Sequence, residues 1–320
     1  MKYIDSLGVS VIVPCYNESG YVARAIRSVL DQEYTQVEII IVDDGSTDST
    51  RAIVLGFGNL VRYIYQNKSG VSIARNQGVK EASHPLIFFL DADDQLLPHA
   101  LSTMVRTMAR HGDSCVLVGS SSYYRNGPSE EESKSHIEPI TEAIISGSDL
   151  ILKNRMPCAN LVNRQAFLKA GGFDPKMTHS EDRDLSIRMA AQGTLCRISS
   201  ELLIIENRVG SAHRNTLKMK QGMKEVLKKS LSSQIIPDIS YFEWRQAHAV
   251  LHYQVSTMHS EQRESKMALF ELIMSGLYCP FLQRSRLPEF PRFFRLRRSA
   301  VLIKRLLNSL YSDEKYCINI

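Results

Sequence analysis

Short, continuously apolar runs in the first 123 residues constrain the fold of this chain more than any other feature. The runs are residues 9–13, 37–42, 61–65, 86–90 and 115–118. Segments with the 3.6-residue period of amphipathic helices lie between them. Strands without polar alternation are buried on both faces, which is typical of a mostly parallel sheet covered by helices. The pattern therefore predicts a doubly wound α/β domain.

The second part of the chain has a different, helical pattern. Residues 126–138 are polar and rich in Ser and Glu, which indicates a surface loop, and a less regular α+β section follows. Helical stretches then follow at residues 217–235, 241–258, 266–277 and 293–310. We expect a domain boundary near Ala212, with an α/β domain over residues 1–211 and a helical region over residues 212–320.

Composition and charge exclude several classes of protein. The chain has 320 residues, 43% of them hydrophobic and 23% charged, as in ordinary globular proteins. No apolar run approaches the ~20 residues that span a bilayer, and no signal-peptide pattern is visible. The six cysteines include no Cys-x-x-Cys pair, which disfavours a disulfide framework or a structural zinc site. We therefore expect a cytoplasmic protein, whose net charge of +5 permits polyanion binding without requiring it.

Polar and acidic residues follow each of the first four apolar runs, at the point where each predicted strand ends. These clusters are residues 14–18, 43–48, 67–70 and 91–94. The carboxyl ends of parallel strands lie at one edge of a sheet, where open α/β folds bind ligands. We therefore expect the clusters to form one site.

The carboxylates of Asp91 and Asp93 favour a divalent cation. Like charges at a rigid strand end repel unless a cation neutralises them, and hard oxygen ligands suit Mg²⁺ or Mn²⁺ together with phosphate oxygens. A turn with an Asp cap for the next helix would explain the same residues. A calcium EF-hand loop is excluded, because Leu96 and Ser102 stand where that loop needs Gly and Glu.

Nucleotide recognition would explain the second cluster. Asp43 or Asp44 could accept a hydrogen bond from a base or ribose while Tyr16 lies against the base ring, although a capped turn is an alternative. Arg75, in the predicted helix after the third run, could contact a diphosphate or be an ordinary solvated residue. The dinucleotide glycine signature and the phosphate loop of P-loop NTPases are absent from the sequence, so both classes are disfavoured.

A predicted helix near residue 181 begins with the carboxylates Glu181, Asp182 and Asp184. Acidic residues in a first helical turn complement the helix dipole. Three acidic residues in one turn are more than helix capping requires. One carboxylate directed at the predicted site would serve as a general base.

Taken in order, these motifs resemble the family 2 glycosyltransferases, inverting enzymes of GT-A fold that use nucleotide-activated sugars. The matching segments are residues 9–18, 42–48, 70–78, 89–94, 171–174 and 181–185. The resemblance spans roughly residues 9 to 211. It implies a Rossmann-like, mostly parallel mixed sheet flanked by helices, to which this chain adds a helical C-terminal region.

The resemblance also implies which residues bind the donor nucleotide. They are Pro14, Tyr16, Glu18, Asp43, Asp44, Arg75, Asp91 and Ala92. By the same resemblance, Asp44 would read the base, Arg75 would approach the diphosphate, and Asp91 would contact the ribose side.

Metal and catalytic residues are implied in the same way. Asp93 would hold Mn²⁺ or Mg²⁺, and either His213 or Arg208 would add a contact to the metal or the diphosphate. The spacing within residues 207–213 is shorter than the family's usual spacing, so the resemblance does not decide between His213 and Arg208. Asp182 would take the proton from an acceptor hydroxyl as that oxygen attacks the anomeric carbon, so one displacement inverts the configuration.

We therefore expect a metal-dependent glycosyltransferase that moves a sugar from a nucleotide diphosphate sugar to an acceptor hydroxyl in surface polysaccharide or glycolipid assembly. The resemblance to this family favours a UDP-sugar as the donor. A nucleotidyltransferase is disfavoured, because residues 14–20 lack a glycine-rich basic loop. A catalytically inactive nucleotide-binding or scaffold protein of the same fold is the alternative.

The basic and apolar segment at residues 292–307 has no counterpart among these motifs and contains no acidic residue. Such a helix can lie on an anionic bilayer, which would place the protein at the inner face of the membrane beside a lipid-linked saccharide acceptor. Alternatively, its apolar face packs on the catalytic domain, or the helical region pairs two subunits. Nucleic acid is disfavoured, because two adjacent Phe residues form a small stacking platform.

Overall fold

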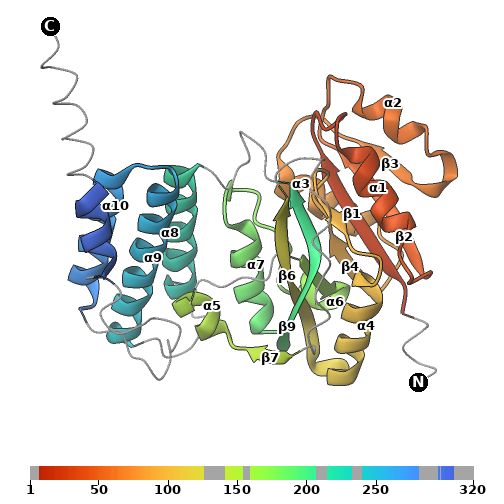
Figure 1. The fold of residues 1–320 in the computed structure, drawn as a ribbon. Helices are drawn as coiled ribbons and strands as arrows, with labels where there is room; N and C mark the ends of the chain where they lie inside the picture. The colour runs from red at the N-terminus through yellow and green to blue at the C-terminus, as the bar shows by residue number, and fades with distance from the viewer. Residues whose placement is uncertain are drawn as a thin grey trace, which may run out of the picture. The chain divides into compact units, whose positions relative to one another are not determined.

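The computed structural model describes residues 7–125, 141–153, 159–206, 215–232, 240–280, 295 and 297–305. The chain divides into two compact units (Figure 1). The first comprises Met1–Leu150 and Arg155–Ser211, and the second comprises Ile151–Asn154 and Ala212–Ile320.

The first unit is built on a mixed sheet. Its strands are β1 (Val9–Cys15), β2 (Val37–Asp43), β3 (Arg62–Tyr65), β4 (Leu86–Phe89), β5 (Gln95–Leu96), β6 (Cys115–Arg125), β7 (Glu142–Ile145), β8 (Ala159–Asn163) and β9 (Thr194–Glu206). Within the described residues their order is β3-β2-β1-β4-β8-β6-β9-β5, and β7 pairs with β9. Strands β1 to β4 are mutually parallel, whereas β8 is antiparallel to both β4 and β6.

Strand β3 differs from the sequence prediction. Its run was expected to be buried on both faces, but Arg62 and Tyr65 are exposed. The reason is its position at the edge of the sheet, where β2 is its one neighbour among the described strands. Strand β6 also extends well beyond the predicted run and pairs in parallel with β9.

Helices cover both faces of the parallel strands. The helices of this unit are α1 (Val22–Leu30), α2 (Thr50–Leu55), α3 (Val71–Glu81), α4 (Ala100–His111), α6 (Arg164–Lys169) and α7 (Glu181–Ala190). Val11 and Val13 of β1 share a buried cluster with residues of α1 and α4. Ile12 points to the opposite face, because successive strand residues alternate. There it meets α3, where a Cβ added at Gly78 would lie 2.4 Å from the Ile12 side chain.

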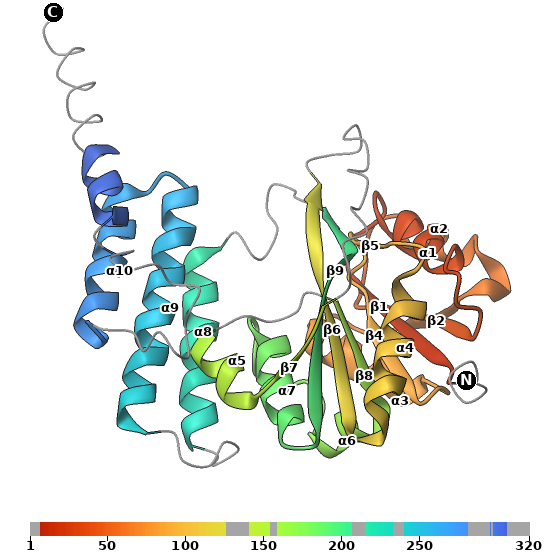
Figure 2. The same cartoon turned by 60° about the horizontal axis from the view of Figure 1, so that its bottom comes forward.

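The second unit is helical. It contains α8 (Thr216–Ser232), α9 (Tyr241–Glu261) and α10 (Ser265–Tyr278), and helical residues follow at 297–305. Figure 2 shows α8, α9 and α10 side by side. The residues of α5 (Gly147–Lys153) are divided between the two units. Among the described residues, no helix is both long enough and apolar enough to cross a bilayer.

The basic segment near the C-terminus packs within the helical unit. Leu302 is fully buried in a cluster with Ala268 and Leu272 of α10, and Tyr253 of α9 packs against them. The sequence leaves packing on the catalytic domain as one alternative for this segment, whereas Leu302 contacts α9 and α10 of the helical unit, and its neighbours Val301 and Ile303 remain exposed.

Candidate active site

The carboxyl ends of β1, β2 and β3 lie in register at one edge of the sheet. Cys15 pairs with Asp43, and Asp43 pairs with Tyr65. Leu90, which follows β4, donates its backbone N–H to the carbonyl oxygen of Ile12 at 3.0 Å. The polar clusters predicted from the sequence therefore follow four neighbouring parallel strands at the same edge.

The loops after β1 and β2 are locked together by side-chain hydrogen bonds. The Asn17 N–H donates to Ser46 Oγ at 2.9 Å, and the Thr47 N–H donates to Asn17 Oδ1 at 2.8 Å. The Ser19 N–H donates to Asp48 Oδ2 at 3.1 Å. Asn17 adopts a left-handed backbone with φ of 55°, a conformation that Asn tolerates better than most residues. The shared bonds fix the two loops as one surface.

Asp43, one of the predicted nucleotide contacts, is fully buried at the end of β2. Its Oδ1 accepts from the Ser46 N–H at 2.8 Å, and its Oδ2 accepts from the Tyr63 hydroxyl at 2.6 Å. Burial and the hydrogen bond to Asp43 together raise the pKa of Tyr63. Both Asp43 oxygens are therefore engaged within the protein.

Asp44, the predicted base-reading residue, is also buried and anchors the start of α3. Its Oδ1 accepts from Gln66 Nε2 and from the Ser69 N–H, both at 2.7 Å. Its Oδ2 accepts from the Gly70 N–H at 2.8 Å. Gly70 has φ of +98°, which a side chain would strain. Three of about four acceptor positions on the carboxylate are thus used to hold this turn.

Tyr16 lies at the surface beside these turns, and an ammonium group lies against its ring. Lys68 Nζ is 3.4 Å from the ring centroid, a cation–π contact. Pro14 is buried within β1, and Glu18 is partly buried. The Glu18 carbonyl accepts from two N–H groups at the start of α1. The ring face predicted to lie against a base is therefore shared with Lys68.

Arg75 joins three elements of the site. The residue is 8% exposed. Its Nη2 donates to Asp91 Oδ1 at 2.7 Å, in the turn after β4, and its Nη1 donates to Glu181 Oε1 at 2.8 Å, at the start of α7. The guanidinium also lies 5.1 Å from the Phe173 ring centroid. Within the described part of the chain its Nε is buried without a hydrogen-bond partner.

Asp182 follows Glu181 in the first turn of α7 and is exposed. Its Oδ1 accepts from the Arg183 N–H at 2.7 Å. Desolvation by the surrounding protein and then the negative charge of Glu181 raise the pKa of Asp182 to about 6, although the charge of Arg75 opposes the shift. A carboxylate with this pKa that reaches the surface is suited to accept a proton near neutral pH.

The turn after β4 carries the predicted metal ligand. The Asp94 N–H donates to the Asp91 carbonyl at 3.0 Å, which closes the turn. The Asp91 side chain is 51% exposed, Asp93 is partly buried, and the Ala92 side chain packs in the apolar core. His213 and Arg208, the other predicted contacts, lie outside the described residues.

Oxygen ligands at this turn fit a divalent cation in an open site. No group of three or more His, Cys, Asp or Glu side chains gathers among the described residues, so no closed protein cage is formed there. Mg²⁺ and related ions commonly take one or two carboxylates and complete their shell with substrate phosphates and water. The carboxylates of Asp91 and Asp93 have the required chemistry.

The structure adds residues that the sequence prediction did not assign. Glu181 is the partner of Arg75, Phe173 lies beside the guanidinium, and Lys68 lies against Tyr16. The Glu181–Asp182 pair was visible in the sequence as an excess of first-turn acids. Its link to Arg75 joins residues 106 positions apart, for which no local pattern exists.

Comparison with known proteins assigns the family. The profile described as Glycosyl transferase family 2 matches residues 10–171. The chain belongs to this family. The match includes the predicted nucleotide-binding residues and Asp93, and it ends before Asp182.

Relatives in this family match the first part of the chain. An uncharacterized glycosyltransferase of Rickettsia typhi is 30% identical over an alignment of 190 residues, and the match covers 55% of this chain and 57% of that protein. Glycosyltransferase GlyG of Streptococcus pneumoniae is 31% identical over an alignment of 162 residues, and the match covers 49% of this chain and 50% of that protein. The chain thus spans about half the length of these relatives.

Solved structures share the fold. S. aureus TarS superposes with a TM-score of 0.60 at 17% identity, covering 86% of this chain and 49% of TarS. A second TarS structure, of residues 1–349, contains UDP-GlcNAc. The mannosyltransferase PcManGT from Pyrobaculum calidifontis was solved in complex with GDP-Man and Mn²⁺. It superposes with a TM-score of 0.56 at 16% identity, and the match covers 96% of this chain and 89% of PcManGT. The mixed sheet with flanking helices is therefore the GT-A fold of these glycosyltransferases.

Proposed function

We propose that this chain transfers a sugar from a nucleotide diphosphate sugar to an acceptor hydroxyl with inversion of configuration. The observation that carries the proposal is Asp182, an exposed carboxylate with a raised pKa. It adjoins Glu181, which Arg75 ties to Asp91 at the carboxyl ends of the parallel strands. Family membership and the GT-A fold support the same reaction class.

The donor nucleotide is proposed to bind at the locked loops after β1 and β2. Tyr16 offers a partly exposed aromatic ring, and Lys68 beside it can move from the ring to a ligand phosphate or ribose, since an exposed ammonium is held weakly. The remaining acceptor position of Asp44 would receive a base N–H. We assign Asp43 to the support of these loops, because both of its oxygens are already used.

UDP-sugars are the proposed donors. TarS was solved with UDP-GlcNAc and PcManGT with GDP-Man and Mn²⁺, so nucleotide sugars of this chemistry fit the same fold. Asp93, with Asp91 beside it and His213 in the segment outside the described residues, would hold Mn²⁺ or Mg²⁺. Such an ion would stabilise the charge that develops on the departing diphosphate.

Asp182 is the proposed catalytic base. Its carboxylate would accept the acceptor's hydroxyl proton while the oxygen forms its bond to the anomeric carbon and the bond to the diphosphate breaks. One displacement with one base inverts the anomeric centre, whereas a retaining route needs a second carboxylate as a covalent nucleophile. Arg75 positions Glu181 and Asp91, and its positive charge favours the ionised form of Asp182.

A saccharide or a lipid-linked saccharide is the proposed acceptor, in surface polysaccharide or glycolipid assembly. Selectivity among hexoses depends on a few contacts to individual hydroxyl groups, so acceptors must be screened directly.

A nucleotide-release screen tests the proposal. The full chain is incubated with UDP-GlcNAc, UDP-glucose or GDP-mannose, with Mn²⁺ or with EDTA, and with a panel of saccharide acceptors. We expect acceptor-dependent release of UDP from a UDP-sugar in Mn²⁺ and loss of release in EDTA. We also expect that donor to raise the unfolding temperature, because a ligand stabilises the state it binds. A stabilising donor without release under any condition would instead favour an inactive nucleotide-binding protein.

A further inference from the structure

Helix α10 of the second unit buries two polar side chains and exposes four large apolar ones. Its buried side includes Glu271 and Ser275, both with no exposed surface. Its outward side carries the apolar residues Met267, Phe270, Ile273 and Leu277, which are between 42% and 65% exposed. These four residues recur at helical spacing, so they form one stripe, named here the α10 stripe. A stripe of large apolar side chains on a soluble helix normally faces a core, and here it faces outward.

Hydrogen bonds on the buried side fix this orientation. Glu271 Oε1 accepts from Lys220 Nζ of α8 at 2.5 Å, and Glu271 Oε2 lies 2.6 Å from His252 Nδ1 of α9. Ser275 Oγ donates to the Ala249 carbonyl at 2.6 Å. Rotating α10 to bury its apolar stripe would break these bonds and leave a buried carboxylate unpaired, which is costly. The hydrogen bonds of Glu271 and Ser275 therefore hold the α10 stripe at the surface of the unit.

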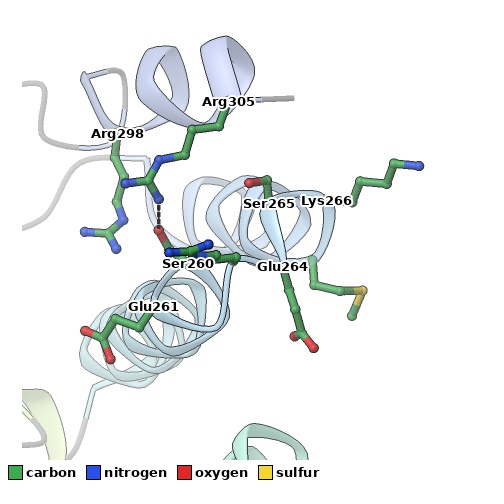
Figure 3. Close-up of a pocket in the computed structure, with 9 residues that line it drawn as sticks. Ser260, Glu261, Glu264, Ser265, Lys266, Arg298 and Arg305 are labelled. Carbon is green, nitrogen blue, oxygen red and sulfur yellow. Dashed lines mark hydrogen bonds between the residues drawn. The ribbon is translucent and has the colours of Figure 1, made fainter. Parts of the chain in front are cut away.

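A basic cavity lies at the N-terminal end of the same helix. It has a volume of about 930 Å³ and is formed by the end of α9, the start of α10 and helical residues 297–305. Its cations are Arg263, Lys266, Arg298 and Arg305. Figure 3 shows Arg298 and Arg305 extending from one helix, with Arg305 Nη1 donating to Ser260 Oγ of α9 at 3.1 Å.

The cavity has a net positive charge. Glu261 and Glu264 also line it, and Glu264 Oε2 is held by His259 Nδ1 at 2.5 Å. Met267 belongs to both the cavity lining and the α10 stripe, so the cationic and apolar surfaces are continuous. Exposed Val301, Ile303 and Lys304 extend the mixture of apolar and basic side chains along the neighbouring helix.

We propose that the α10 stripe and the basic cavity together bind the surface of an anionic phospholipid membrane. The apolar stripe enters the boundary between headgroups and acyl chains, and lipid phosphates bind the cations of the cavity. Charge favours this occupant, because the cavity lining has four cations against two carboxylates and anionic lipid phosphates supply the complementary charge. The surface would hold the chain where a lipid-linked acceptor is presented.

Vesicle flotation of the full chain tests this proposal without any measurement of sugar transfer. One set of vesicles is phosphatidylcholine alone, and the other is an equal mixture of phosphatidylcholine and phosphatidylglycerol. We expect binding to the mixed vesicles and loss of binding in high salt. The Phe270→Ser/Ile273→Ser variant should partition at least about tenfold more weakly, because two large apolar side chains no longer enter the interface.

Charge variants test the cavity separately. Lys266→Gln/Arg305→Gln should lower partitioning about 30-fold, since each cation near such a surface contributes about fivefold. The matched controls lie in the first unit: Leu55→Ser/Leu168→Ser replaces equally exposed leucines, and Lys80→Gln/Lys169→Gln removes the same charge from exposed lysines. Both controls should stay within about twofold of the parent protein.

Three results would overturn the proposal. The first is failure of the parent protein to bind mixed vesicles. The second is equal binding by the α10 variant and its leucine control. The third is a dimer in light scattering that Phe270→Ser/Ile273→Ser converts to a monomer while vesicle binding is unchanged, which would show that a second copy covers the stripe. UDP-sugar binding is measured in parallel, so a failure here is distinguishable from a failure of the proposed transferase activity.

Discussion

Replacing Arg75 with Met removes the cation that links α3, the turn after β4 and α7. Met has no charge but retains an apolar stem that can pack against Phe173. Glu181, with a side chain only 14% exposed, loses its partner where water cannot fully replace it. Asp91 is half-exposed and can turn toward solvent. The two ion pairs are therefore expected to contribute unequally to stability.

The expected cost follows from these exposures. Breaking a buried ion pair costs about 3–5 kcal/mol, and an exposed pair contributes about 0–1 kcal/mol. Discounting the first range for the partial exposure of Glu181 gives about 2–3 kcal/mol, and the Asp91 pair adds about 0.5 kcal/mol. The free energy of unfolding should therefore fall by about 3 kcal/mol. At about 2–4 °C per kcal/mol for a unit of this size, the unfolding temperature should fall by roughly 6–12 °C.

Calorimetry of the full chain at neutral pH measures the transition of the first unit. Arg27→Met is the matched control, because Arg27 is exposed on α1 and its loss should cost less than about 0.5 kcal/mol. A double-mutant cycle with Glu181→Gln should give a coupling energy of about 2 kcal/mol. An Arg75→Met protein as stable as Arg27→Met, or a coupling energy near zero, would refute the reasoning.

Three further predictions follow from the same contacts. The Glu181 charge raises the pKa of Asp182, and the Arg75 charge opposes that rise. The acid limb of the pH–rate profile, expected near pH 6, should therefore move to lower pH in Glu181→Gln and to higher pH in Arg75→Met. Measurement of kcat at a series of pH values tests both shifts. The raised pKa also means that the folded state holds the Asp182 proton more tightly than the unfolded chain. The stabilising contribution of the Asp182 carboxyl is therefore present at low pH and lost as the pH rises through about 6. Asn stays uncharged at every pH, so urea titrations should show Asp182→Asn gaining stability relative to the parent protein above that pH. Asp44→Ala should lower the free energy of unfolding by about 2–4 kcal/mol in the same assay, because it leaves three N–H donors without their carboxylate. An Asp44→Ala protein of unchanged stability would show that these bonds contribute nothing.

The parallel half of the sheet could be predicted because its inner strands are buried on both faces. β1, the end of β2 and most of β4 have buried side chains, so their sequences lack polar alternation. β3 has similar residues but lies at the edge, and an apolar run does not report how many neighbours a strand has. The antiparallel β8 and the long pairing of β6 with β9 join segments distant in sequence, which local periodicity cannot detect.

The location of the candidate site was predictable, but the partners of its side chains were not. The polar clusters follow strand ends, so topology alone brings them to one edge. Their hydrogen bonds depend on three-dimensional placement: Asp44 is occupied by the turn before α3, and Arg75 is shared between Asp91 and Glu181. The exposure of the α10 stripe was also hidden, because α10 has apolar residues on more than one side and its sequence does not show which side the neighbouring helices cover.

The central claim is that Asp182 accepts the proton of the acceptor hydroxyl. Its most direct test is kcat for sugar transfer by Asp182→Asn at saturating donor, with the acceptor found in the nucleotide-release screen and with donor affinity measured in parallel. Loss of a general base should lower kcat by about 10²–10⁴-fold while the donor dissociation constant stays within about threefold. An Asp182→Asn protein that transfers sugar at nearly the parent rate would contradict the account.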